Sequence, residues 1–163
     1  MTQQEYENKI KELQDELEKL KAAKIADSGK RWKPNQSLEY WLVCNGDVAV
    51  CNYRNTTFDI WNYLTGNCFK TKEEAEDRAK EIEYTARYKN YIEEHSEPID
   101  WENYNQRKFF ARYDHRCTNG IEINNWYAVQ FQGVIYASSE QIIKDAIKEI
   151  GEDNFKKYVL GVK

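Results

Sequence analysis

One local pattern occurs twice in this chain of 163 residues. Residues 66–75 (GNCFKTKEEA) and 133–142 (GVIYASSEQI) begin 67 residues apart, and each runs from a glycine through a short apolar segment to a hydroxyl residue. The hydroxyl residue is Thr71 in the first copy and Ser138 in the second, and each is followed three positions later by Glu or Gln. This spacing is typical of a capping box, in which two side chains satisfy the free N–H groups at a helix start. The pattern predicts two similar units, each with strands followed by a helix.

Hydrophobic periodicity and turn residues give the expected elements. In the first unit we expect a primed hairpin turn at Gly46-Asp47, strands at 38–45, 48–54 and 58–64, and a helix over 72–94. In the second unit we expect strands at 108–116, 121–131 and 134–137, then a helix from the Ser138 cap to Ile150 with Gly151 after it. A helical turn over 152–157 and a final strand over 158–162 complete the prediction.

The length fits one compact domain, or two small units with an appendage. The expected fold class is α+β, with two antiparallel-sheet-plus-helix units preceded by an N-terminal coiled-coil helix. The expected segments are the helix 1–25, a linker 26–37, the first unit 38–95, a connection 96–107 and the second unit 108–163.

The N-terminal segment carries a narrow apolar stripe. Ile10 and Leu17 occupy a positions of a heptad, and Leu13 and Leu20 occupy d positions, among Lys, Glu, Asp and Gln. The stripe is too narrow for a globular core, and an isolated helix of this length is marginal in water. We expect it to mediate a homodimer or higher oligomer. Packing on the body of the chain or on a target, and a solvated helix, are the alternatives.

Aromatic residues make up 14% of the chain, and strand alternation divides the large apolar residues of the strands into two sets. The set expected in a helix-covered core is Leu38, Tyr40, Leu42, Val48, Val50, Phe58, Ile60, Leu64, Ile121, Ile123, Tyr127, Val129 and Phe131. The other set lies among polar residues and is expected to form a binding surface: Trp41, Tyr53, Trp61, Tyr63 and Trp126. Alternatively, the two units pack these faces against each other.

Charge is concentrated in two segments. Residues 72–102 contain eleven acidic and five basic residues, including Glu73, Glu76 and Glu83. Such a face is either solvated or able to meet a basic nucleic-acid channel of a partner. Residues 30–33 (KRWK) either anchor the linker through one tryptophan or bind nucleic acid. The net charge of −4 gives no general footprint for nucleic acid, so direct binding is not expected.

The motifs of common enzymes are absent. The sequence has no GxSxG, Walker A, HExxH or dinucleotide-binding glycine motif, and its four cysteines and two histidines lack zinc-ligand spacing. We therefore expect no enzyme activity, no cofactor and no metal, with the cysteines as reduced, mostly buried thiols. Because no apolar stretch approaches about 18 residues and no signal peptide is recognisable, a cytoplasmic location without membrane contact is expected.

From Leu38 onward, the chain resembles a family of small accessory proteins of phages and prophages of Gram-positive bacteria. The matching elements are Tyr40-Trp41, the segment 66–76 (GNCFKTKEEAE) and the closing segment 150–162 (IGEDNFKKYVLGV). Proteins of this kind often carry a short coiled coil ahead of a body rich in tyrosine and tryptophan. The resemblance implies a phage-encoded modulator of host machinery acting in the host cell, with counter-defence proteins such as anti-CRISPR inhibitors as the subclass.

The function expected from this resemblance is inhibition of a host defence protein, such as a CRISPR nuclease, by binding and occlusion. Two alternatives remain open. One is a sponge that sequesters a nucleotide immune signal between rings such as Trp61 and Trp126. The other is a phage regulator that binds nucleic acid through the basic linker.

Overall fold

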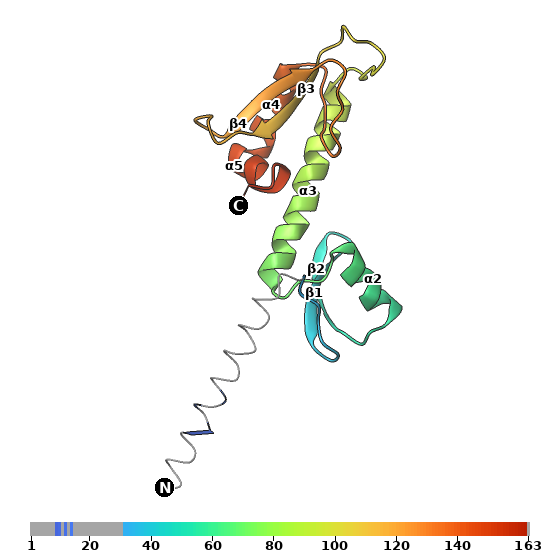
Figure 1. The fold of residues 1–163 in the computed structure, drawn as a ribbon, viewed down its shortest axis with the longest axis vertical. Helices are drawn as coiled ribbons and strands as arrows, with labels where there is room; N and C mark the ends of the chain where they lie inside the picture. The colour runs from blue at the N-terminus through green and yellow to red at the C-terminus, as the bar shows by residue number, and fades with distance from the viewer. Residues whose placement is uncertain (1–8, 11, 13, 15–30, 163) are drawn as a thin grey trace.

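The computed structural model describes residues 9, 10, 12, 14 and 31–162. Helix α3 (Lys72–His95) is the longest described element and joins two units, as Figure 1 shows. The first unit contains strands β1 (Glu39–Cys44) and β2 (Asp47–Asn52) and helix α2 (Thr57–Thr65). The second contains β3 (Lys108–Tyr113), β4 (Ile121–Trp126), α4 (Glu140–Ile150), α5 (Glu152–Asn154) and the π-helix η1 (Phe155–Val159). The chain is thus an α+β protein with two small antiparallel sheets.

The internal repeat is visible in the backbone. Each unit has an antiparallel hairpin, and one residue of a later segment pairs with the first strand of that hairpin. The pairs are Trp41 with Phe69 and Phe109 with Ala137, so both partners recur 68 residues later. In each pair the two residues exchange backbone hydrogen bonds of 2.8–3.0 Å. The true repeat is therefore one residue longer than the spacing of the two glycines.

The first hairpin turns at Asn45-Gly46, where both residues have positive φ, 53° and 89°. This is the signature of a primed two-residue turn, which matches the twist of the flanking strands. The predicted turn at Gly46-Asp47 is wrong by one position, because Asp47 already pairs with Cys44 in the ladder. The predicted type of hairpin is confirmed.

The predicted strand over 58–64 is wrong, because this segment forms α2. Thr56 is its N-cap and forms a capping box with Asp59, and Gly66 closes it with φ 88° in the left-handed region. The alternation of apolar and polar residues in this segment resembles that of a strand. The local hydrogen bonds of the cap outweigh that pattern.

The two long helices of the repeat begin at equivalent residues. Thr71 caps α3 and forms the predicted capping box with Glu74. Ser139, and not the predicted Ser138, caps α4 by accepting a hydrogen bond from the backbone N–H of Ile142 at 3.4 Å. Ser138 instead exchanges hydrogen bonds with Ser96, the C-cap of α3, and thereby joins the second unit to the end of that helix.

The strands of the second unit are shorter than predicted, and the chain ends differently. Strand β3 stops at Tyr113 and β4 at Trp126. Helix α4 ends at Ile150 before Gly151, as predicted, and α5 follows it directly. The predicted final strand over 158–162 is wrong, because Tyr158 and Val159 belong to η1. Its backbone N–H to carbonyl bond from Leu160 to Phe155 spans five residues, the hallmark of a π-helix.

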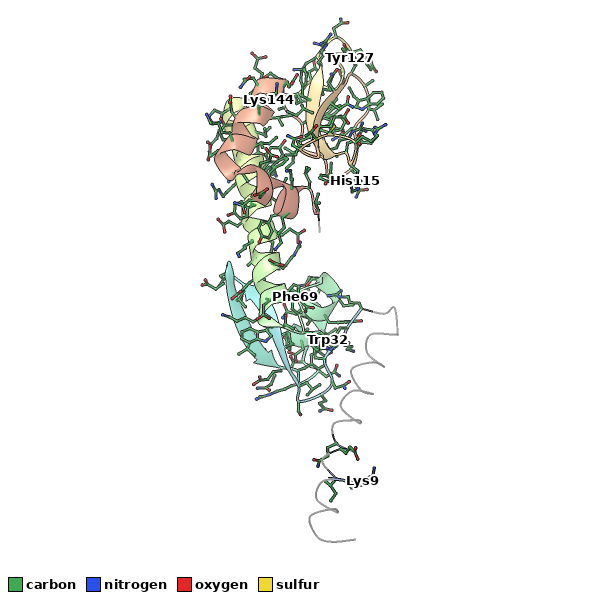
Figure 2. The ribbon with its side chains drawn as sticks, turned by 90° about the vertical axis from the view of Figure 1, so that its left-hand side faces the viewer. Lys9, Trp32, Phe69, His115, Tyr127 and Lys144 are labelled. Carbon is green, nitrogen blue, oxygen red and sulfur yellow. The ribbon has the colours of Figure 1, made fainter. Side chains whose placement is uncertain are left out.

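Each unit has its own core, and α3 is packed against both units. Tyr40, Leu42, Tyr53 and Cys68 form the first core, with Trp32 packed against them. The second core is Tyr88, Ile92, Ala137, Ile143, Ala146, Ile150 and Phe155. Figure 2 shows the labelled Trp32 and Phe69 in the first unit, and His115, Tyr127 and Lys144 in the second. Ile82, in the middle of α3, is 47% exposed, so this helix is not buried along its whole length.

Strand parity predicted the two cores only in part. Tyr40 and Leu42 are buried as expected, and Ile121 and Ile123 are half-buried against the second core. Val48 is half-buried. The remaining members of the expected core are exposed: Leu38, Val50, Phe58, Ile60, Leu64, Tyr127, Val129 and Phe131. Most of these lie in α2 or beyond the end of β4, where no strand alternation applies.

Candidate interaction surface

Helix α2 presents apolar side chains to solvent and polar side chains to the protein. Phe58, Ile60, Trp61 and Leu64 are 54%, 39%, 65% and 65% exposed, whereas Asp59 and Asn62 are 3% and 6% exposed. We call the four apolar residues the α2 outer face. An ordinary surface helix has the opposite arrangement, with its apolar stripe toward the core. The α2 outer face is therefore a candidate surface for a partner.

Asp59 fixes this orientation. Its carboxylate accepts hydrogen bonds from the Tyr40 hydroxyl at 3.0 Å, the Arg54 N–H at 2.9 Å, and the N–H and hydroxyl of Thr56 at 3.0 and 2.8 Å. Burial opposes ionisation, but the hydrogen bonds outweigh it and hold the pKa of Asp59 below its usual range. A buried charge with satisfied partners cannot be turned to solvent without leaving those donors unpaired.

Asn62 attaches the same helix to the first sheet through Asn67. The side-chain N–H₂ of Asn67 donates to Asn62 Oδ1 and to the carbonyl of Val43, both at 2.9 Å. Asn67 Oδ1 in turn accepts from the N–H of Val43 at 2.9 Å. The amide of Asn67 therefore satisfies the backbone of β1 as a neighbouring strand would. With Asp59 and Asn62 both held by polar contacts, α2 keeps its apolar side outward.

The exposed residues are of the kind that dominates protein contacts. Fully burying a large apolar side chain contributes about 1.5–3 kcal/mol. Tryptophan is enriched among residues that carry binding energy, and such residues cluster at the centre of an interface. Trp61, flanked by Phe58 and Leu64, meets that description on a helix that is already ordered.

The other predicted binding aromatics of the first unit are not free. Tyr53 is 3% exposed and belongs to the first core, so its predicted place on an exposed face is wrong. Trp41 and Tyr63 are half-buried. The Arg31 guanidinium lies 4.9 Å from the centre of the Tyr63 ring, and Lys33 Nζ lies 5.2 Å from it. These two cations of the basic linker cover Tyr63, and Trp32 anchors the linker as one interpretation predicted.

The second unit has an apolar surface of its own at the end of β4. Trp126, Tyr127, Val129 and Phe131 are 41–45% exposed, and we call this segment the 126–131 loop. Lys108, fully buried, donates from Nζ to the Tyr127 carbonyl at 2.8 Å and to the carbonyls of Asn103 and Gln106. The loop therefore has a fixed backbone attachment while its side chains face solvent.

The two exposed tryptophans do not form one pocket. Trp61 lies on α2 and Trp126 on β4, and Figure 1 shows these elements in the two different units joined by α3. A nucleotide could not be stacked between both rings within one chain. Of the predicted binding aromatics, Trp61 and Trp126 are exposed, but they belong to separate surfaces.

The acidic residues of α3 lie in a helix face with alternating charge. Glu76 pairs with Lys72 at 2.9 Å, and Glu83 lies 3.8 Å from Arg87. Glu73 is exposed in the first turn, where the free N–H groups of the helix favour an anion. Exposed pairs of this spacing contribute only about 0.3–0.5 kcal/mol each. The pairing favours a solvated helix face over an unbroken negative surface.

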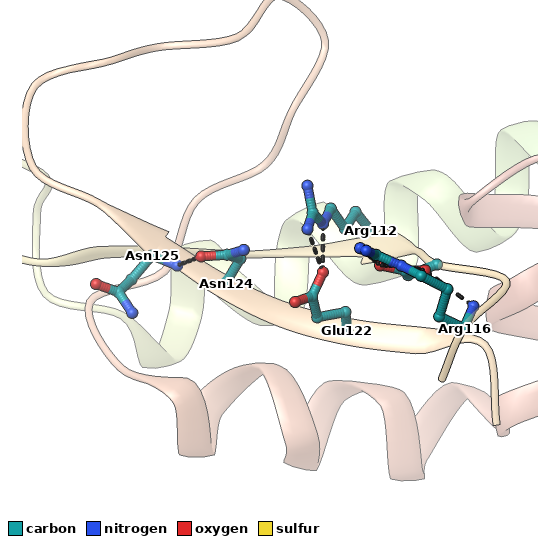
Figure 3. A network of polar contacts seen from close by, with 6 residues as sticks. Arg112, Arg116, Glu122, Asn124 and Asn125 are labelled. Atoms are coloured by element: carbon teal, nitrogen blue, oxygen red, sulfur yellow. Dashed lines mark hydrogen bonds and ion pairs between the residues drawn. The ribbon is translucent and has the colours of Figure 1, made fainter. Parts of the chain in front are cut away.

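Polar side chains pair with one another on the face of the second hairpin that carries Arg112 and Glu122. Figure 3 shows Arg112 paired across the strands with Glu122, Arg116 paired with Asp114, and Asn124 bonded to the N–H of Asn125. The side-chain hydrogen bond from Arg116 holds the pKa of Asp114 well below its usual range. Both arginines thus have carboxylate partners, and this face offers no free cation cluster among the residues shown.

The predicted oligomerisation stripe lies mostly outside the described residues. Leu13, Leu17 and Leu20 are not described, and Ile10, which is, is helical and 41% exposed.

The four cysteines are free, but Cys44 is exposed, contrary to the expected burial. Burial raises the pKa of the Cys68 thiol to about 11, so this thiol is unreactive at neutral pH.

Sequence reasoning missed three members of the α2 outer face. It placed Phe58, Ile60 and Leu64 in the core, and only Trp61 on a surface. The T-x-x-D spacing from Thr56 to Asp59 was the available signal, since it is a capping motif that starts a helix. A helix starting there puts the residue pairs 58/61 and 60/64 on neighbouring positions of one side.

Comparison with known protein families, with curated proteins and with solved structures found no match to this chain. Within the described part of the chain, no helix is both long enough and apolar enough to cross a membrane. The same residues contain no group of three or more His, Cys, Asp or Glu placed to hold a metal ion.

Proposed function

We propose that this chain is a non-enzymatic binding protein that occludes a protein partner, with the α2 outer face at the centre of the contact. The observation that carries the proposal is the reversed polarity of α2. Its buried side is fixed by Asp59 and Asn62, and its exposed side carries Phe58, Ile60, Trp61 and Leu64. A preordered surface loses little conformational entropy on binding, which favours affinity.

The chemistry of this surface favours protein over nucleic acid. All four residues are apolar, and a nucleic acid is held first by cations that neutralise its phosphates. Two basic residues close to this helix, Arg31 and Lys33, rest on the ring of Tyr63, which itself belongs to α2. A partner with an apolar groove suits the stripe of Phe58, Trp61 and Leu64, as in the docking of an amphipathic helix into such a groove.

The partner that we propose is a host defence protein, such as a CRISPR nuclease, and the proposed effect is stoichiometric inhibition. This assignment comes from the resemblance to phage accessory proteins. Self-association through the N-terminal heptad would place two or more α2 outer faces in one particle, which raises avidity without new contacts. The paired charges of α3 make its acidic face the weaker candidate for the contact.

The test is DNA cleavage by purified RNA-guided nucleases from Gram-positive hosts, with this protein added in increasing molar ratio. The wild type is expected to inhibit one of them near stoichiometric ratio. Trp61→Ala is expected to weaken inhibition at least about 30-fold, the equivalent of ~2 kcal/mol for a central aromatic residue.

Leu64→Ala and Ile82→Ala form a matched pair for this assay, since both remove an exposed aliphatic side chain from a helix. Leu64→Ala should weaken inhibition and Ile82→Ala should not. Equal inhibition by both variants and by Trp61→Ala would remove α2 from the contact. Unimpeded cleavage by every nuclease tested with the wild type would contradict the proposed class of partner.

Self-association is tested separately by light scattering. Deleting residues 1–25 removes Ile10, Leu13, Leu17 and Leu20, and should convert a dimer or higher species into a folded monomer. An unchanged number of chains per particle would remove the coiled-coil proposal while leaving the α2 proposal intact.

A further inference from the structure

Strand β2 is an open edge of the first sheet, because within the described residues its one hydrogen-bonded neighbour is β1. Trp41 bonds Phe69 through its backbone N–H and carbonyl, so Val50, opposite Trp41, points the same groups away from β1. Val48 and Asn52, two positions before and after Val50, point theirs outward as well. These outward groups make no hydrogen bond within the described part of the chain.

The corresponding edge of the second sheet is closed by side chains. Ile121 and Asn125 point their N–H groups outward from β4, because Phe109, opposite Asn125, directs its own backbone groups away from that strand. The Ile121 N–H donates to Asn119 Oδ1 at 3.2 Å, and the Asn125 N–H donates to Asn124 Oδ1 at 2.8 Å. A second strand could not bond these two groups without displacing the asparagine side chains.

The β2 edge lacks the features that protect edge strands in natural proteins, such as lysine, proline or a bulge. Its sequence, DVAVCN, contains one charged residue, Asp47, at its first position, and it pairs with β1 residue for residue. Val50 is 46% exposed and Asn52 is also exposed. A flat, largely uncharged edge with free backbone groups is a template for another extended strand.

This edge is complementary to itself. Two copies of β2 in antiparallel orientation, with the two-fold axis at Val50, bring Val50 opposite the partner's Val50 and Val48 opposite the partner's Asn52. Each such pair exchanges two backbone hydrogen bonds, so the outward groups of both copies are satisfied in one register. Asp47 then lies opposite the partner's Tyr53, and no like charges face each other. A symmetric contact of this kind closes after two copies.

We propose that β2 pairs with β2 of a second copy of this chain and joins the two first sheets into one four-stranded antiparallel sheet. One short strand from each chain is a small contact beside the roughly 1,000 Å² of a stable interface. The sheet therefore forms at high protein concentration, or in a particle that another contact already holds together. The pairing uses neither the α2 outer face nor residues 1–25, so it does not depend on the proposed inhibition.

Nuclear magnetic resonance of an equal mixture of isotope-labelled and unlabelled full-length protein tests the pairing. In the proposed register, Ala49 lies opposite the partner's Cys51 in a non-hydrogen-bonded pair, whose Cα atoms are about 4.5 Å apart. An isotope-filtered nuclear Overhauser signal between the α-hydrogens of Ala49 and the partner's Cys51 is expected. A concentrated sample without any signal between chains from β2 would overturn the proposal, whatever the result of the nuclease assay.

Val50→Lys places two ammonium groups opposite each other at the axis, where like charges are unfavourable. The variant should lose the signal between chains, and the outward N–H groups of Val48 and Asn52 should exchange about fivefold faster or more. Val129→Lys is the matched control, because Val129 is 42% exposed, close to the value for Val50, and lies outside both sheets. This control should behave as the wild type does.

The N–H of Ala49 faces β1 and reports whether the hairpin is folded in each variant. With this N–H still protected, an unchanged signal in Val50→Lys, or the same loss in Val129→Lys, would overturn the proposal. If Val50→Lys unfolds the hairpin and Ala49 exchanges freely, the signal between wild-type chains decides alone.

Discussion

The two units differ most in the segment between the second strand and the bridging residue. In the first unit this segment forms α2, and in the second it is the irregular stretch that includes the 126–131 loop. The bridging residues recur 68 residues apart, whereas the second strands, aligned at Val50 and Asn125, are 75 apart, so this segment is seven residues shorter in the second unit. In the first unit it carries Phe58 and Trp61, and in the second Trp126 ends β4 and Val129 follows it. All four side chains are exposed. The same place in the repeat thus displays apolar residues on two different backbones.

A buried charged side chain holds each of these segments, and the sign of the charge suits the backbone around it. Asp59 accepts from N–H and hydroxyl groups at the start of α2, where free N–H groups are available. Lys108 donates to three carbonyls of irregular segments. A carboxylate thus stabilises the start of a helix, whereas an ammonium stabilises irregular chain. The comparison indicates that Asp59 orients the α2 outer face and that Lys108 positions the 126–131 loop.

The largest effect is expected from Asp59→Ala, which leaves four donors without their acceptor. We expect a loss of about 3–5 kcal/mol in the free energy of unfolding, as for other broken buried charge networks. Urea denaturation measures it. Asp47→Ala, which removes an exposed carboxylate from β2, should stay within about 0.5 kcal/mol. Equal midpoints for the two variants would show that Asp59 does not hold α2.

Lys108→Met should have the next largest effect, because it keeps the length of the side chain but removes three hydrogen bonds. A loss of about 2–3 kcal/mol is expected. Hydrogen exchange should show faster exchange in the 126–131 loop and unchanged exchange in α2. Lys144→Met, which removes an exposed lysine paired with Glu140, is the control. If the 126–131 loop of Lys108→Met exchanged its amide hydrogens as slowly as that of the wild type, Lys108 would not be the residue that holds the loop.

The pH dependence of stability tests the charge on Asp59. Its pKa is lowered in the folded state, so the stabilisation is fully present above the ordinary value of about 3.9. It is lost as the pH falls through the lower folded value. Asp59→Asn should therefore differ from the wild type more at pH 7 than at pH 2.5 in urea denaturation. A difference that does not change with pH would mean that the carboxylate is not ionised when folded.

Local signals predicted the elements that local interactions determine. The first hairpin, α3 and α4 follow from turn residues, capping hydroxyls and periodicity, and their structures agree to within a few residues. Helix α2 was missed because two local signals conflict there, strand-like alternation and the Thr56 cap. The π-helix was missed because its spacing depends on packing against α3, which is not encoded within residues 155–159.

The candidate surface was predicted less well than the fold. Trp61 and Trp126 were expected on a surface and are exposed. Tyr53 was not recognised as a core residue, and Leu64 was not recognised as a surface residue. The error at Leu64 comes from a burial pattern set by Asp59 and Asn62, two polar residues that hydrophobic periodicity assigns to solvent. Tyr53 lies just past the end of β2, where strand alternation no longer applies, and its ring packs against Tyr40. Buried polar contacts between distant segments cannot be seen from the sequence pattern alone.

The two helix caps should have smaller effects that differ from each other. Thr71→Ala and Ser139→Ala should each cost about 1 kcal/mol. The loss should be larger for Thr71, since its capping box includes Glu74, whose carboxylate also accepts from the N–H of Lys70 at 2.8 Å. Thermal melts measure both. No effect of Ser139→Ala would contradict the assigned start of α4.

The smallest effect on stability is expected from Trp61→Ala, and this contrast separates surface from core. Trp61 is 65% exposed, so its truncation should change the free energy of unfolding by no more than about 0.5 kcal/mol. Trp126 is 45% exposed and its ring lies 6.4 Å from that of Phe131, so Trp126→Ala should cost about 1 kcal/mol. A buried tryptophan would cost about 3–5 kcal/mol.

Thermal melts of the two variants can be run before any partner is identified. A collapse of the melting temperature in Trp61→Ala would make this residue part of a core and remove the α2 outer face as a binding surface. An unchanged melt would leave its exposed ring without a stabilising role in the isolated chain, as expected if its role is to contact a partner.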